Sequence, residues 1–303
     1  MPRQILPERF YMLTRRCTQR QFLLRPDATT NNAFVYCLAE AAQRFEIEII
    51  ASQQMSNHHH TVLFDRYGRV IEFTAHFHKM LAKCQNAHWG RWENMWATRA
   101  PSLVVLEERS DVIGKIVYAA TNPVLDNLVD RVDHWPGAKL VHAMLRREPL
   151  QAHRPSHFFR EHGLMPASIS LRFVIPPELG EPDAIVEEVG RRITETEQEE
   201  ARKRCESGTR ILGRRAARQQ SWRDTPTTHE QRRNLDPRVA AKSKWHRVEA
   251  LARNDTFLMA YRLARAAWLA AKPALFPPGT YWLARFAGVP VLSVYAERET
   301  SSG

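Results

Sequence analysis

Residues 44–65, RFEIEIIASQQMSNHHHTVLFD, contain two segments with the pattern of neighbouring β-strands. In the first, apolar side chains alternate with glutamates, which is typical of a strand with one buried face. The second begins at a polar turn around Ser56 and Asn57 and runs through three histidines into an apolar stretch. Successive side chains of a strand point to opposite faces, so we expect His58 and His60 to share a face and His59 to point away. Two imidazoles on one face of a strand form half of a metal site.

The segments around this pair predict an α+β fold. Strand patterns recur at 10–16, 102–108 and 168–178, and helical periodicity recurs at 31–44, 70–84, 111–122 and 244–271. This order predicts an antiparallel sheet with helices packed on one face. We place the end of this domain near residue 150, which gives a domain at 1–150 and a basic, mostly helical accessory region at 151–303.

The charge of the chain predicts an anionic partner. The 303 residues carry a net charge of +11, and a hydrophobic fraction of 44% is enough for a packed core. No apolar run approaches the ~18 residues that a membrane-spanning helix needs, and the N-terminus lacks the hydrophobic region of a signal peptide. We therefore expect a cytoplasmic, nucleoid-associated protein that binds nucleic acid and no membrane.

Histidine pairs are more often surface or core residues than metal ligands, so the strand pair alone does not establish a site. A second pair, HFH at 76–78, lies in a helical pattern. Positions i and i+2 of a helix point about 200° apart and do not easily share one ion. The strand pair is therefore the better candidate.

The segment VYAATNP at 117–123 adds a phenol and an amide to the candidate site. Tyr118 and Asn122 lie at positions i and i+4 of the predicted helix, hence on one face, and Pro123 is expected to stop that helix. Asparagine supplies an oxygen ligand, and tyrosine supplies an oxygen that can act as a covalent nucleophile. Read in isolation, Tyr118 is a half-buried aromatic residue and Asn122 a helix cap.

Taken together, these motifs resemble the HUH-endonuclease superfamily, and within it the single-tyrosine transposases, most closely the REP-associated tyrosine transposases. MSNHHHTVLF resembles the strand of that family with the pattern M-P-N-H-hydrophobe-H-L-L, and VYAATNPV resembles its Y-I-x-x-N-P-V helix. The opening strand with TRRCTQRQ and the tryptophan-rich connection also occur in the family's order. The resemblance covers residues 5–140 and implies a ferredoxin-like HUH nuclease core.

The resemblance implies a residue set and a reaction. His58, His60 and Asn122 would bind Mg²⁺ or Mn²⁺, and Tyr118 would attack a phosphate of single-stranded or hairpin DNA. The products would be a 5′-phosphotyrosyl enzyme and a free 3′-hydroxyl, and a later attack by a DNA hydroxyl would rejoin strands. Related enzymes occur as monomers and as dimers, so either state is open.

Arginines and tryptophans are the candidates for contact with the nucleic acid. Arg15, Arg16 and Arg20 are the expected phosphate contacts beside the first strand. The arginines at 191–218 are either further contacts or the solvated face of a charged helix. Trp89, Trp92 and Trp96 either stack on unpaired bases or, more commonly for such residues, pack in the protein.

Two departures from the family pattern leave alternatives open. His59 stands where the family has a bulky hydrophobe, and Asp126 stands in a segment where the family commonly has arginine. Both favour a domesticated DNA-binding protein that recognises hairpins without cleaving them, whereas the intact Tyr118, His58, His60 and Asn122 argue against it. A metal-dependent hydrolase that uses the histidines with an acidic residue such as Asp65 is another alternative, and RNA is another possible substrate.

Overall fold

The fold is built around a five-stranded sheet in which four strands are antiparallel and a fifth, short strand is parallel to its neighbour. The protein is represented by a computed structural model that describes residues 2–228 and 237–293. The strands are β1 (Arg9–Arg16), β2 (Ile47–Gln54), β3 (His58–Asp65), β4 (Ser102–Leu106) and β7 (Val239–Ala240), in the spatial order β2-β3-β1-β4-β7. The predicted α+β class is confirmed.

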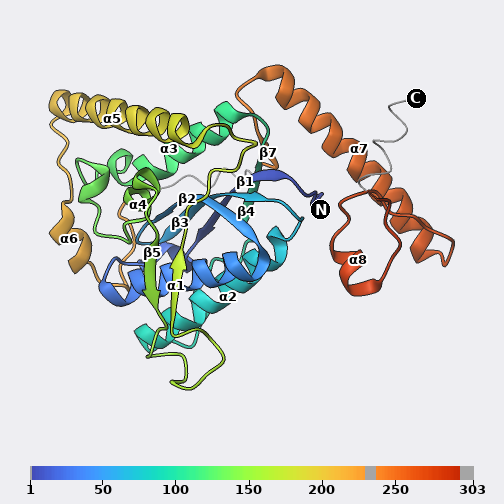
Figure 1. Ribbon diagram of the computed structural model, residues 1–303, viewed down its shortest axis with the longest axis horizontal. Helices are drawn as coiled ribbons and strands as arrows, with labels where there is room; N and C mark the ends of the chain where they lie inside the picture. The colour runs from blue at the N-terminus through green and yellow to red at the C-terminus, as the bar shows by residue number, and fades with distance from the viewer. Residues whose placement is uncertain (1, 229–236, 294–303) are drawn as a thin grey trace.

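Helices cover both faces of the sheet (Figure 1). On one face lie α1 (Ala28–Phe45) and α2 (Val70–Trp89), and on the other lie α3 (Arg109–Leu125), α4 (Leu140–Arg146) and α5 (Pro182–Ser207). The predicted placement of helices on one face is therefore wrong. The reason is visible in β3, where Leu63 packs with α1 and α2 while its neighbours Val62 and Phe64 pack with α3. A strand that is apolar on both faces needs a cover on both.

Pro123 does not stop α3, which continues to Leu125. Proline lacks only its own N–H, and in the last turn of a helix this removes a single backbone hydrogen bond. The turn is closed by the N–H of Asp126, which donates to the carbonyl of Asn122 at 3.0 Å. Asn122 is thus held in regular helix and not in a fraying end.

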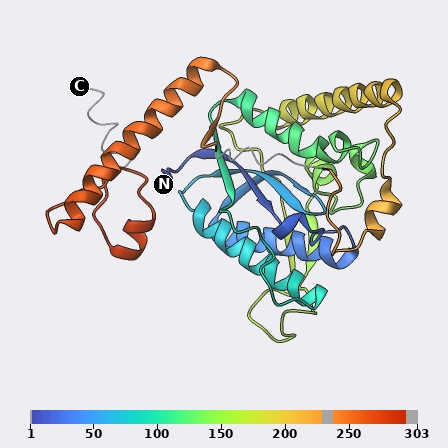
Figure 2. The same ribbon diagram turned by 180° about the vertical axis from the view of Figure 1, so that it is seen from behind.

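The packed core continues past residue 150. The hairpin of β5 (Leu150–His153) and β6 (Ser168–Leu171) packs on α1, and α5 packs on α3. After α6 (Arg214–Gln219), the helices α7 (Lys244–Leu269) and α8 (Trp282–Ala287) form an arm beside the body, with a small core of its own around Phe276 (Figures 1 and 2). The accessory region is helical over much of its described length, as expected. No helix in the described ranges has both the length and the apolarity to cross a membrane.

Candidate metal and tyrosine site

The three histidines occupy the first three positions of β3, between β2 and β1. Register places His60 opposite Thr14 of β1 and His58 opposite Arg16. His58 and His60 lie on the face that α3 covers, with their ring centroids 4.8 Å apart, whereas His59 lies on the face covered by α1 and α2. The structure thus brings the predicted pair together.

A hydrogen bond to the Nδ1 atom orients each ring of the pair. His60 Nδ1 lies 2.8 Å from the Thr14 hydroxyl, and His58 Nδ1 lies 2.6 Å from Asn57 Oδ1. The Asn57 amide is itself fixed, because its Nδ2 donates to the carbonyl of Arg20 at 3.2 Å. Its oxygen therefore accepts the proton of His58 Nδ1, which leaves a lone pair on His58 Nε2.

The Nε2 atoms and the Asn122 amide form the candidate ligand set. His60 Nε2 is buried and has no hydrogen-bond partner among the described residues. Burial lowers the pKa of His60 well below its usual range, with the nearby His58 adding to the shift, so the ring is neutral and can ligate. His58 Nε2 lies 3.2 Å from Asn122 Oδ1. Two lone pairs that face each other are stabilised by a proton or a metal ion between them.

Two imidazoles and one amide oxygen fit a divalent metal that keeps open positions. Within the described ranges, no group of three or more His, Cys, Asp or Glu is arranged to hold a metal ion. The candidate set differs from such groups because its third ligand is an amide. The observation that favours a bound metal ion here is the buried Nε2 atom of His60, which has no hydrogen-bond partner among the described residues.

Tyr118 lies one helical turn before Asn122, at the rim of the same site. Its ring centroid is 5.4 Å from that of His60, and 42% of its surface is exposed. The Nζ atom of Lys115 lies 5.5 Å from the Tyr118 ring centroid. The Tyr118 phenol beside the candidate ligands is therefore accessible from solvent, and it lies next to the positive charge of Lys115.

The sequence of α3 sets the angular position of these side chains. Glu108 and Asp111 form a reciprocal capping box that starts the helix. Ile113, Ile116 and Ala120 are buried against the sheet. This apolar stripe fixes the rotation of the helix, and Tyr118 and Asn122 then project toward β3 together.

His59 belongs to the core on the opposite face. It is fully buried, and its Nε2 lies 2.9 Å from Nε2 of His78 on α2. Burial lowers the pKa of both rings well below the usual range, so both are neutral and one N–H donates to the other ring. The polar partner on α2 explains how a histidine replaces a hydrophobe at this position.

Asp65, the acid of the alternative hydrolase, lies at the far end of β3 and on the face of His59. Its carboxylate accepts the backbone N–H groups of Arg69 and Val70 at 2.9 Å each, at the start of α2. The carboxylate holds the start of α2 and does not reach the histidine pair, so the structure contradicts Asp65 as the acid of that hydrolase.

The predicted phosphate contacts lie in different environments. Arg16 is exposed on the side of the candidate site, and Arg20 donates to the Thr228 carbonyl at 2.8 Å. Arg15 points to the other face, where its guanidinium lies 5.8 Å from the ring centroid of Trp96. Among the predicted tryptophans, Trp96 is buried and Trp89 half-buried, which fits packing, whereas Trp92 is 97% exposed.

Sequence reasoning missed Thr14, Asn57 and Lys115. Asn57 directly precedes His58, so a signal for it was present in the quoted stretch. Thr14 becomes a partner of His60 only through the register of β1 and β3, and no local pattern reveals that register.

Comparison with known proteins gives limited similarity. No family model and no curated protein matches the chain. One similar solved structure is a REP-associated tyrosine transposase bound to a REP hairpin, at 17% identity and a TM-score of 0.41, covering 48% of this chain and 85% of that one. Another is the tRNA(His) guanylyltransferase of Saccharomyces cerevisiae, at 10% identity and a TM-score of 0.30, covering 42% and 64%. With TM-scores below 0.5, neither likeness carries weight beside the geometry of the site.

Proposed function

We propose that this chain is a metal-dependent, single-tyrosine nuclease and strand transferase of the HUH type that acts on single-stranded or hairpin DNA. The observation that carries the proposal is the meeting of His58, His60 and Asn122 around a buried, unpartnered imidazole nitrogen, with Tyr118 at its rim. The net charge of +11 and the motif resemblance support a nucleic-acid substrate.

The residues divide into a ligand group and a nucleophile. Mg²⁺ or Mn²⁺ at His58, His60 and Asn122 would orient and polarise the scissile phosphate. The Tyr118 oxygen forms a bond to phosphorus while the bond to the 3′-oxygen breaks, which leaves a 5′-phosphotyrosine and a 3′-hydroxyl that takes up the proton. The ammonium group of Lys115 lies beside the Tyr118 ring and would lie near the negative charge of a bound phosphate.

A non-cleaving DNA-binding protein is the alternative that needs a direct test. Of the two sequence departures that favour it, the one at His59 carries less weight, because His59 packs against His78 and lies away from the candidate site. The deciding experiment is covalent capture on labelled single-stranded DNA hairpins, with matched RNA hairpins, in Mn²⁺ and in EDTA. Denaturing gels would compare the wild type with Tyr118→Phe and His58→Ala, and with Tyr67→Phe as a control at an exposed tyrosine elsewhere.

The proposal predicts a slow-migrating covalent band that requires metal, Tyr118 and His58 and that survives Tyr67→Phe. Hairpin binding without a covalent band would establish the binding protein instead. Cleavage that persists in Tyr118→Phe would exclude the tyrosine mechanism.

A further inference from the structure

The segment at residues 211–228, called here the crossing segment, runs from α5 across the rim of the candidate site. The N–H groups of Leu212 and Gly213 donate to the carbonyls of Asn127 and Leu128, each at 2.9 Å, just beyond α3. Ala217 is fully buried, in one cluster with Met55 and Val124. The segment is thereby fixed against both α3 and the turn that leads to His58.

At its far end the crossing segment stacks an aromatic ring on α2. The rings of Trp222 and Trp89 are stacked with an interplanar angle of 27° and centroids 6.0 Å apart. Guanidinium groups lie over the same rings, with Arg223 at 4.9 Å and Arg91 at 5.5 Å from the Trp222 centroid and Arg25 at 4.9 Å from that of Trp89. These residues, with the exposed Trp92 that follows Arg91, are called here the aromatic–arginine surface.

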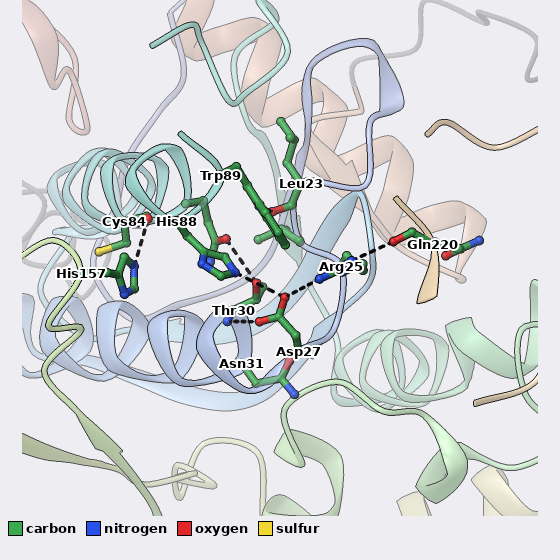
Figure 3. Close-up of polar contacts among 12 residues, drawn as sticks. Leu23, Arg25, Asp27, Thr30, Asn31, Cys84, His88, Trp89, His157 and Gln220 are labelled. Atoms are coloured by element: carbon green, nitrogen blue, oxygen red, sulfur yellow. Dashed lines mark hydrogen bonds and ion pairs between the residues drawn. The ribbon is translucent and has the colours of Figure 1, made fainter. Parts of the chain in front are cut away.

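Hydrogen bonds hold Trp89 and Arg25, the lower layer of this surface beneath Trp222, in place (Figure 3). Trp89 Nε1 donates to the carbonyl of Leu23 at 3.0 Å. Arg25 donates to Asp27 at 3.1 Å and to the carbonyl of Gln220 at 3.0 Å. Trp89 and Arg25 are therefore ordered before any ligand binds, and a ligand that binds above them does not have to order these two side chains.

The upper layer of this surface carries two arginines, which lie over the ring of Trp222. Neither Arg91 nor Arg223 forms an ion pair with a carboxylate within the described ranges, and Arg223 is exposed. Trp92 is 97% exposed and makes no ring contact within the same ranges. Cations beside accessible indole and guanidinium planes suit a ligand that is both anionic and flat.

The surface adjoins the candidate site through one loop. The N–H of Cys17 donates to the carbonyl of Asn57 at 2.7 Å, and the N–H of Leu24 donates to that of Ser56 at 2.8 Å. The loop at 17–25 thus joins the surface to the turn before His58. The surface and the turn before His58 therefore flank the same loop.

We propose that the aromatic–arginine surface binds unpaired bases of the nucleic-acid strand whose phosphate is placed at Tyr118, an inference that rests on the proposed function. Unpaired bases present the flat faces that stack on indole and guanidinium planes, and their phosphates supply the negative charge. Bases in a duplex have these faces covered by their neighbours, so the surface selects single-stranded segments.

The test is the affinity of the full-length protein for fluorescein-labelled 12-nucleotide DNA, measured by anisotropy in EDTA so that no cleavage occurs. The probes are the single strand, the same strand with abasic sites and the corresponding duplex. The proteins are the wild type, Trp92→Ala and Arg223→Ala, with Tyr67→Ala as the control. Tyr67 is 56% exposed, and Arg69 lies 5.3 Å over its ring at the other end of β3.

The inference predicts that Trp92→Ala and Arg223→Ala each weaken single-strand binding on the order of five- to a hundredfold. Abasic sites should weaken binding by the wild type more than binding by Trp92→Ala, and Tyr67→Ala should bind as the wild type does. Equal affinity for intact and abasic strands would overturn the inference, because it would show binding by charge alone. An equal loss in Tyr67→Ala would also overturn it, because the loss would then not be specific to the surface.

Covalent capture separates this inference from the proposed function. If the wild type forms the phosphotyrosine band while the surface variants bind normally, the surface assignment fails and the function stands. If the surface variants lose binding and no band forms, the surface stands and the nuclease assignment fails.

Discussion

At the scale of single residues, the candidate metal site depends on side chains that are not ligands. Thr14 holds the ring of His60 from β1, and Asn57 holds that of His58 from the preceding turn. Partners of this kind fix the tautomer and the ring plane of a ligating histidine. The affinity for metal should therefore respond to substitutions that leave all ligands in place.

Thr14→Val removes the hydroxyl at His60 Nδ1 and keeps the shape of the side chain. We expect Mn²⁺ binding, measured by calorimetry, to weaken by roughly 10- to 100-fold. The control is Thr61→Val, because Thr61 contacts the ring of His59 on the opposite face. Thr61→Val should lower stability but not metal affinity, and an equal loss of affinity in both variants would contradict the role of Thr14.

At the scale of elements, β3 is joined to α2 by the buried pair of His59 and His78. Replacing only His78 with leucine leaves a buried nitrogen of His59 without its partner, so we expect the free energy of unfolding to fall by about 1–3 kcal/mol. Replacing both with leucine should restore much of that loss, because no orphaned polar group remains. Urea unfolding of the wild type, His59→Leu, His78→Leu and the double variant gives the coupling energy, and additive effects would show that the pair is not coupled.

The start of α1 depends on Asp27. Its side chain accepts a hydrogen bond from the N–H of Thr30 at 2.8 Å and a second one from the guanidinium of Arg25 at 3.1 Å. Burial raises the pKa of Asp27, but hydrogen bonds from His88, Thr30 and Arg25 outweigh it and leave the pKa below its usual range. Asp27→Ala should cost about 1 kcal/mol through the lost cap. Asp183→Ala, at an aspartate whose side chain is 79% exposed, should cost less than about 0.5 kcal/mol.

The stabilisation from Asp27 should depend on pH. A carboxyl with a lowered pKa in the folded state binds fewer protons there than in the unfolded chain. The stabilisation that Asp27 contributes is therefore complete at pH values above the pKa of the unfolded chain, about 3.9, and is lost as the pH falls below that pKa. Urea unfolding between pH 7 and pH 3 should show that the difference in free energy of unfolding between wild type and Asp27→Ala becomes smaller only at the acidic end. A difference that stays constant over this pH range would refute the charge effect.

At the scale of the whole molecule, the region after residue 150 contributes to the environment of the candidate site. Ala217 of the crossing segment packs with Met55, three residues before His58, and with Val124, two residues after Asn122. Ala217→Asp would bury an unpaired charge, and we expect a loss of at least about 2 kcal/mol of stability together with weaker Mn²⁺ binding. Gln219→Asp, at an exposed position of the same helix, should change neither. Unfolding curves and Mn²⁺ titrations of both variants check this, and unchanged Mn²⁺ binding in a folded Ala217→Asp would separate the crossing segment from the site.

The sequence by itself determined the features with a short period. The alternation in β3 placed His58 and His60 on one face, and the spacing of Tyr118 and Asn122 placed them on one side of a helix, because two- and 3.6-residue periods are properties of the local backbone. The α+β class followed from the order of such segments.

Only the tertiary structure decided which elements meet. Helices on both faces of the sheet, the bond from Thr14 to His60 and the stacking of Trp222 on Trp89 all join residues far apart in the chain. The partner of a buried side chain is chosen by strand register and by the packing of whole faces, and neither leaves a local pattern. The residues of the candidate site can therefore be found in two short motifs, whereas the side chains that support them and the proposed strand-binding surface appear only once the chain is folded.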